Sequence, residues 1–92
     1  MNREEALSVL NAKLDEYRRM TYAELAAKVG DEDIAEVVGP SGTAYQVEIL
    51  VTWDHKPNGD VRVLGSIDDG KLYSAIRPLC SDILVAADDQ GR

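Results

Sequence analysis

The amino-acid sequence predicts an α+β fold, in which two amino-terminal helices pack on one face of a four- or five-stranded, mainly antiparallel meander sheet. Apolar residues at the start of the chain recur at spacings of three and four, the periodicity of helices with one buried face. Over residues 43–54 large apolar residues alternate with polar ones, as in a strand buried on one side. Short turn sequences then separate further alternating segments.

The first helix is predicted over about residues 3–19. Asn2 with Glu5 three positions later matches an amino-terminal cap in which each side chain bonds the other residue's backbone. One face of this helix is apolar and should pack against the sheet; it carries Ala6, Leu7, Leu10, Leu14, Tyr17 and Met20.

A second, shorter helix is predicted over about residues 22–29. Thr21 with Glu24 forms another capping pair at its start. Gly30 is typical of the position just beyond a helix end, because glycine readily adopts positive φ. The two helices should therefore form a bent pair.

Several strands follow the helices. They are predicted over about residues 34–38, 43–54, 61–67 and 72–77. The connections contain typical turn residues, namely Gly39-Pro40-Ser41-Gly42, His55 to Asp60, and Asp69-Gly70. The tail 83–87 is either a fifth strand along an edge or a short helix, and the strand is the favoured interpretation.

A two-residue turn at Asp69-Gly70 implies a register for the strands on either side of it. On the face toward the helices it pairs Ile67 with Leu72, Gly65 with Ser74, and Val63 with Ile76. On the far face it pairs Ser66 with Tyr73, Leu64 with Ala75, and Arg62 with Arg77, and Leu50 of the preceding strand should neighbour Leu64.

That far face is the most credible interaction surface in the sequence. Its apolar centre would be Leu50, Leu64, Tyr73 and Ala75, and its polar rim would include Arg62, Arg77, Gln46 and Glu48. This arrangement is typical of a protein interface, although scattered surface apolar residues or a covering tail would explain it too. We expect a small protein-interaction module that binds a protein partner or itself, and a homodimer is the simplest version.

No pattern predicts catalytic, cofactor-binding or metal-binding residues. The loop from Asp54 through His55 to Asp60 carries alternate oxygen donors that suit a hard cation, but the same residue types build turns. Asp68 and Asp69 are adjacent carboxylates, and in a turn both are expected to be solvated. A small-molecule or metal-dependent enzyme, with a site in this loop or in a cleft between helices and sheet, is kept as an alternative.

Length and charge limit the remaining possibilities. The 92 residues suit a single domain, and no segment has the roughly 18 consecutive apolar residues of a membrane span or the apolar core of a secretory signal, so a cytoplasmic protein is expected. The lone Cys80 is expected to be a partly buried small residue. A net charge of −7 argues against nucleic-acid binding and favours a basic partner, which leaves an acidic decoy as a further alternative.

Several segments together resemble a group of short uncharacterised bacterial proteins. They are Gly39-Pro40-Ser41-Gly42-Thr43 with Tyr45-Gln46-Val47-Glu48, then Trp53-Asp54, Val61-Arg62-Val63 and Gly65-Ser66-Ile67-Asp68-Asp69-Gly70. The likeness covers most of the chain as far as Arg77. It implies a small bacterial α+β domain and brings no activity, cofactor or site residue with it.

Overall fold

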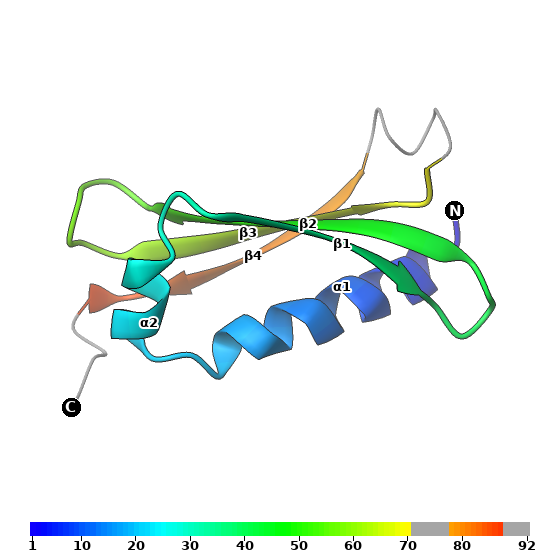
Figure 1. The fold of residues 1–92 in the computed structure, drawn as a ribbon, viewed down its shortest axis with the longest axis horizontal. Coiled ribbons are helices and arrows are strands. Elements are labelled where there is room, and N and C mark those ends of the chain that lie inside the picture. Colours follow the sequence, from blue (N-terminus) through cyan, green and yellow to red (C-terminus); the bar gives the residue numbers. More distant parts are fainter. Residues whose placement is uncertain (71–77, 88–92) are drawn as a thin grey trace.

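Two layers make up the protein, with helices packed against one face of a four-stranded sheet (Figure 1). The computed structural model describes residues 1–70 and 78–87. In chain order the elements are α1 (Arg3–Arg18), α2 (Tyr22–Ala27), β1 (Glu32–Val38), β2 (Ala44–Trp53), β3 (Val61–Asp68) and β4 (Leu79–Val85). The strands lie in the order β1-β2-β3-β4, and each neighbouring pair is antiparallel. The predicted α+β meander is therefore confirmed.

Helix α1 begins where the sequence predicts, but one of its two capping contacts differs. The Asn2 side chain accepts a hydrogen bond from the Glu5 N–H at 3.0 Å, as expected. The Glu5 carboxylate, instead of returning a bond to Asn2, accepts bonds from the Ser41 N–H, the Ser41 hydroxyl and the Tyr45 hydroxyl. Three donors held together by the β1–β2 hairpin outweigh one solvated backbone amide. Glu5 thus ties α1 to this hairpin.

Helix α2 has the capping pair that the sequence predicts. The Glu24 N–H donates to the Thr21 hydroxyl at 3.1 Å, and the Thr21 N–H donates to the Glu24 carboxylate at 3.0 Å. Gly30 follows with φ of +93° and turns the chain into β1. The Tyr22 hydroxyl donates to the Gly59 carbonyl at 2.6 Å, which fixes α2 against the β2–β3 connection.

The core lies between the helices and the inward face of the sheet. Its buried apolar residues are Ala6, Leu10, Leu14, Tyr17, Tyr22, Leu25, Tyr45, Val47, Ile49, Val51, Val61, Val63 and Ile67. Gly65 of β3 lets α1 approach closely, because a Cβ atom there would lie 2.9 Å from Leu10 Cδ1. Leu7, predicted on the buried face, is 36% exposed because it lies at the margin of the helical stripe.

Of the two partners predicted for β3, the preceding strand β2 is confirmed and the pairing with residues 72–77 is wrong. Strand β3 pairs with β2 on one side and with β4 on the other, where Ile67 lies opposite Leu79, Gly65 opposite Ser81 and Val63 opposite Ile83. This register excludes the predicted pairs with Leu72, Ser74 and Ile76, and the predicted strand 72–77 itself lies outside the described residues. Strand β3 ends at Asp68 and β4 begins at Leu79, so the register observed beside β3 is not the one implied by a two-residue turn at Asp69-Gly70.

The tail is a strand, as favoured, but it begins earlier than predicted. Inward and outward residues already alternate from Leu79, and β4 ends at Val85. Strand β4 forms one edge of the sheet, and α1 packs against it.

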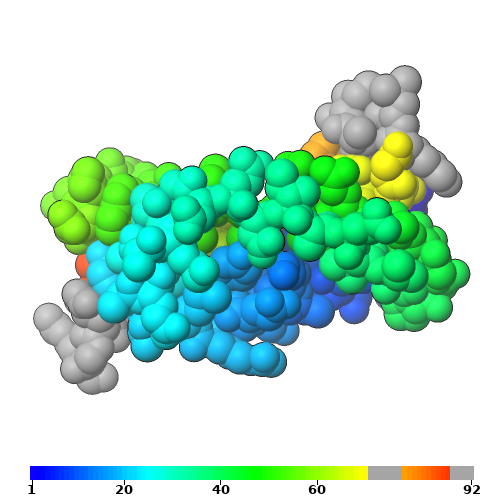
Figure 2. All heavy atoms as spheres, viewed as in Figure 1, coloured from blue at the N-terminus to red at the C-terminus, as the bar shows by residue number. Residues whose placement is uncertain are grey.

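Only one face of the sheet is covered by described elements. Helix α1 packs mainly against β3 and β4, and α2 packs against β2 and β3. In Figure 2 the helices, blue to cyan, lie together along one side of the strands. Within residues 1–70 and 78–87, neither helix has the length and apolar character needed to cross a membrane. The opposite surface of the sheet, called the outer face below, carries no described second layer.

Candidate interaction surface

An apolar stripe crosses all four strands on the outer face. Leu50 of β2 lies directly opposite Leu64 of β3. Ile34 of β1 lies opposite the residue two positions before Leu50, and Leu84 of β4 lies opposite the residue two positions before Leu64. Directly opposed and diagonal positions on one face are both near enough for large side chains to touch. Ile34, Leu50, Leu64 and Leu84 therefore form one continuous diagonal, the apolar stripe.

The stripe is exposed to solvent. Its side chains are 58%, 38%, 39% and 50% exposed for Ile34, Leu50, Leu64 and Leu84, in that order. Seven large apolar residues are exposed in the described part of the chain, and five of them lie on the outer face once Val38 is included. Apolar exposure is thus concentrated on one face, which argues against scattered surface residues as the explanation.

A shallow hollow of about 430 Å³ opens beside the centre of the stripe. It is lined by Glu32, Glu48, Ile49, Leu50, Leu64, Gly65, Ser66, Cys80, Ser81 and Asp82. Ser66 and Cys80 lie opposite each other on β3 and β4, and their small side chains leave this space open. The hollow gives the outer face a depression that a partner's side chain can fill.

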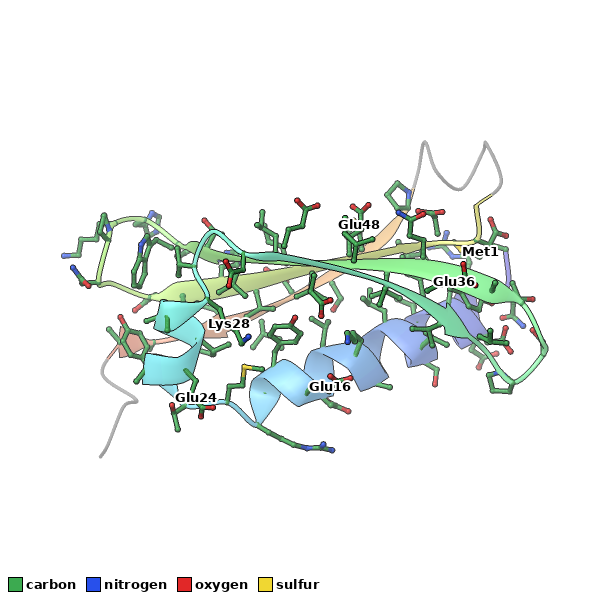
Figure 3. All side chains as sticks on the ribbon, in the orientation of Figure 1. Met1, Glu16, Glu24, Lys28, Glu36 and Glu48 are labelled. Atoms are coloured by element: carbon green, nitrogen blue, oxygen red, sulfur yellow. The ribbon has the colours of Figure 1, made fainter. Side chains whose placement is uncertain are left out.

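Carboxylates border the stripe on both sides. Glu32 lies on one side of the diagonal, and Glu48 and Asp82 lie on the other. Figure 3 shows Glu48 on the side of the sheet away from α1, whereas Glu16 and Glu24 extend from the helices. The rim of the outer face is therefore negative.

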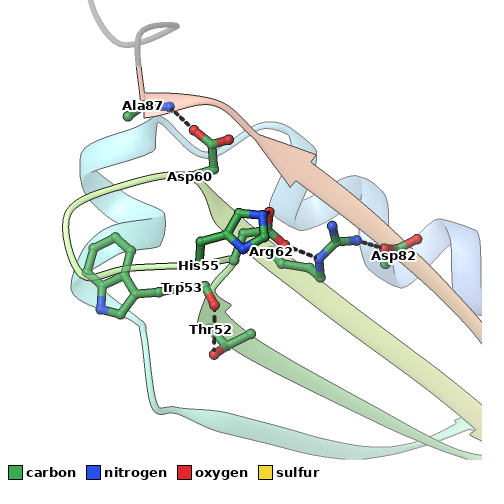
Figure 4. Close-up of polar contacts among 8 residues, drawn as sticks. Thr52, Trp53, His55, Asp60, Arg62, Asp82 and Ala87 are labelled. Atoms are coloured by element: carbon green, nitrogen blue, oxygen red, sulfur yellow. Dashed lines mark hydrogen bonds and ion pairs between the residues drawn. The ribbon is translucent and has the colours of Figure 1, made fainter.

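Arg62 is a cation on this face, but neighbouring carboxylates neutralise it. Its Nε donates to Asp54 Oδ1 at 2.7 Å, and its Nη1 donates to Asp82 (Figure 4). The hydrogen bond to Asp54, more than that to Asp82, raises the pKa of the Arg62 guanidinium above its ordinary value. Because Arg62 is engaged by two acids, it does little to offset Glu32 and Glu48.

Three of the six predicted interface residues lie together on the outer face, namely Leu50, Leu64 and Arg62. The other three, Tyr73, Ala75 and Arg77, lie outside the described residues. The paired position of Leu50 and Leu64 agrees with the predicted register between the second and third strands.

Sequence reasoning missed Ile34 and Leu84 as members of this surface. The alternation that starts at Leu79 was the available signal for Leu84, because it sends the even-numbered residues of β4 outward. Ile34 required the pairing register of β1, which the short turn after Val38 determines.

The carboxylates of the loop from Asp54 to Asp60 are engaged in bonds within the protein. The Asp54 carboxylate binds Arg62, and the Asp60 carboxylate accepts the Ala87 N–H at 3.0 Å (Figure 4). The His55 side chain is 89% exposed, as expected for a turn, and its Nε2 lies 3.4 Å from Asp54 Oδ2. Within residues 1–70 and 78–87, no three His, Cys, Asp or Glu side chains converge on a position that suits a metal ion.

Two further expectations need correction. Asp68 accepts the Gly70 N–H at 2.8 Å, which is turn chemistry, but the Asp69 side chain is only 2% exposed and its carboxylate lies 3.8 Å from the amino-terminal NH₃⁺. The nearby positive charge makes burial of this carboxylate tolerable. Cys80, expected to be partly buried, is exposed because it points outward from an edge strand.

Two tyrosine–carboxylate pairs hold the helix layer to the sheet. The Tyr45 hydroxyl donates to Glu5 at 2.6 Å; this bond raises the pKa of Tyr45 to about 12 and lowers the pKa of Glu5. The Tyr17 hydroxyl donates to Asp33 at 2.9 Å; burial, and then this bond, raises the pKa of Tyr17 to about 12. Phenols that hold their protons so firmly suit structural roles better than proton transfer at neutral pH.

No protein-family model matches the chain, and searches among curated proteins and among solved structures find no match either.

Proposed function

We propose that this chain is a protein-interaction module and that its binding surface is the outer face of the sheet. The observation that carries the proposal is the apolar stripe, which crosses all four strands and has no described element packed over it. Burial of apolar surface is the dominant favourable term in protein association. An exposed apolar centre with a charged border is what a binding surface requires.

The alternatives have less support. The acidic residues are spread over both layers, from Glu16 and Glu24 on the helices to Glu48 on the outer face (Figure 3), whereas a decoy needs them on one surface. An enzyme would need groups free to act on a substrate, and Asp54 and Asp60 are held in structural bonds.

Replacing Leu64 by lysine tests the proposal, and Leu7 provides a matched control. Both are exposed leucines, at 39% and 36%, but Leu7 lies on α1 and away from the outer face. Each replacement should change the free energy of unfolding by only about 0.5 kcal/mol, because both side chains are already partly solvated.

Light scattering across a wide concentration range and capture from an extract of the source cells would be compared for the wild type, Leu64→Lys and Leu7→Lys. We expect Leu64→Lys alone to remove either self-association or a captured protein. A wild type that stays monomeric and captures the same proteins as Leu64→Lys would refute the outer face as a binding surface.

A further inference from the structure

We infer that the outer face binds a cationic amphipathic helix of a partner protein in preference to a second copy of this chain. The inference rests on the proposed function and specifies the chemistry of the partner. Three features support it: the length and shape of the stripe, the sign of the charges along its borders, and the hollow beside its centre.

The dimensions of the stripe match one face of a short helix. Neighbouring strands are about 4.8 Å apart and each pair of residues along a strand adds roughly 6.7 Å, so the diagonal from Ile34 to Leu84 spans roughly 20 Å. A helix rises about 1.5 Å per residue and covers this distance in about 13 residues. Apolar residues at helical spacings of three and four would then meet the four stripe residues in turn.

The charges along the stripe favour a partner helix with basic residues on both sides of its apolar face. Glu32 on one side and Glu48 on the other would face the polar borders of a helix lying along the stripe, and Asp82, on the side of Glu48, is already bound to Arg62. Lysine or arginine residues beside the apolar face of that helix would meet carboxylates on both sides. Such complementarity speeds encounter and suppresses partners of the wrong charge.

The same charges disfavour a second copy. Two chains that stacked their outer faces would bring together two acidic surfaces, each carrying Glu32 and Glu48. Arg62 offers little relief, since Asp54 and Asp82 already bind it. The net charge of −7 on each chain adds a general repulsion between copies.

The hollow provides an anchoring position. It lies between the leucine pair and the small residues Ser66 and Cys80, with Glu48 and Asp82 on its border. An apolar side chain from the helix would fill it beside Leu64, and a basic residue one turn away would reach the border acids. Cys80 is exposed here and is the single cysteine of the chain, so its thiol reports directly on whether the hollow is covered.

Two designed peptides of about 14 residues test the inference. Both carry leucines at helical spacing along one face; one has lysine at the remaining positions and the other has glutamate. Binding to the wild-type protein is followed by fluorescence anisotropy and by the rate at which Cys80 is alkylated. We expect the lysine peptide to bind and to slow alkylation, and the glutamate peptide to do neither up to about 1 mM.

Matched variants separate specific docking from attraction between opposite net charges. Leu64→Lys should weaken binding of the lysine peptide at least about tenfold, while Leu7→Lys leaves it unchanged. The double variants Glu32→Gln/Glu48→Gln, on the outer face, and Glu4→Gln/Glu16→Gln, on α1, have the same net charge, and only the first should weaken binding. Equal weakening by both pairs, or equal binding of both peptides, would overturn the inference.

The inference and the proposed function can fail separately. If the lysine peptide does not bind, but the wild type self-associates and Leu64→Lys prevents this, the occupant is a second copy; the inference fails and the proposed function survives. If the lysine peptide does not bind and Leu64→Lys changes neither the mass in solution nor the captured proteins, both fail.

Discussion

Replacing Gly65 by alanine should destabilise the protein, although alanine is normally the better residue in regular structure. Gly65 lies on β3 where α1 crosses the sheet. An added Cβ would lie 2.9 Å from Leu10 Cδ1 and 3.2 Å from both Leu14 Cδ2 and Ile49 Cδ1. All three neighbours are fully or almost fully buried, so they have little room to move away.

Two opposing terms give the expected size of the effect. Overpacking a dense core costs about 1–3 kcal/mol. Removing the conformational freedom of glycine from the unfolded chain returns about 0.5–1 kcal/mol. The net loss should be about 1–2 kcal/mol, which corresponds to a melting temperature lower by roughly 4–15 °C for a domain of this size.

Urea denaturation followed by the fluorescence of Trp53, the one tryptophan, would measure the loss. Combining Gly65→Ala with Leu10→Ala makes the test more specific. Leu10→Ala alone should cost about 2–5 kcal/mol, but in the double variant the new methyl group occupies part of the cavity. The double variant should therefore lose about 1 kcal/mol less than the sum of the single variants.

Leu25 on α2 supplies the control, because it is fully buried and is not among the atoms nearest to a Cβ at Gly65. Gly65→Ala with Leu25→Ala should be additive. The close-packing argument is wrong if Gly65→Ala is as stable as the wild type, or if Leu10 and Leu25 show the same coupling to position 65.

Three further predictions concern tyrosine hydroxyls. The bond from Tyr45 lowers the pKa of Glu5 in the folded state, so as the pH falls below about 4.5 the unfolded chain binds more protons than the folded chain. The stability that this bond provides is therefore present at neutral pH and lost in acid. In urea denaturation at about pH 7 and pH 3, Tyr45→Phe should lose less stability between the two pH values than the wild type loses. Tyr22→Phe should cost about 1–2 kcal/mol at both pH values, because its acceptor is the Gly59 carbonyl, which does not titrate; the same pH response in both variants would contradict this assignment. The pKa values of Tyr17 and Tyr45 are about 12 in the folded state, against an ordinary value of 10. They imply stability that is present below pH 10 and lost as the pH rises through about 12. Tyrosinate absorbance should therefore develop at higher pH in the native protein than in urea.

Local patterns predicted most of the fold because they are decided by neighbours in the chain. The Thr21–Glu24 capping pair and the turn at Gly30 depend on residues within one or two helical turns. The alternation in β2 also needs no distant information, since one buried face imposes it. These elements were found within a few residues of their true ends.

Long-range choices could not be predicted in the same way. Glu5 had a plausible local partner in Asn2, but the β1–β2 hairpin, more than thirty residues away, offers three donors. Residues 79–85 pair with β3 and contact α1, and neither long-range contact can be recognised from the local pattern. The wrong pairing predicted for β3 removed Leu84 from the predicted surface, although Leu50 and Leu64 were placed correctly.

The distances along the chain between bonded residues also bear on the order of folding. Each hairpin of β1, β2 and β3 closes a short connection, whereas the tyrosine hydroxyl bonds between helices and sheet join residues 16, 37 and 40 positions apart. Short closures cost less entropy and tend to form first. During synthesis the two helices leave the ribosome before any strand, so their apolar faces have no complete sheet to cover until β4, against which α1 also packs, has emerged. The first elements to be made are therefore expected to be the last to find their place.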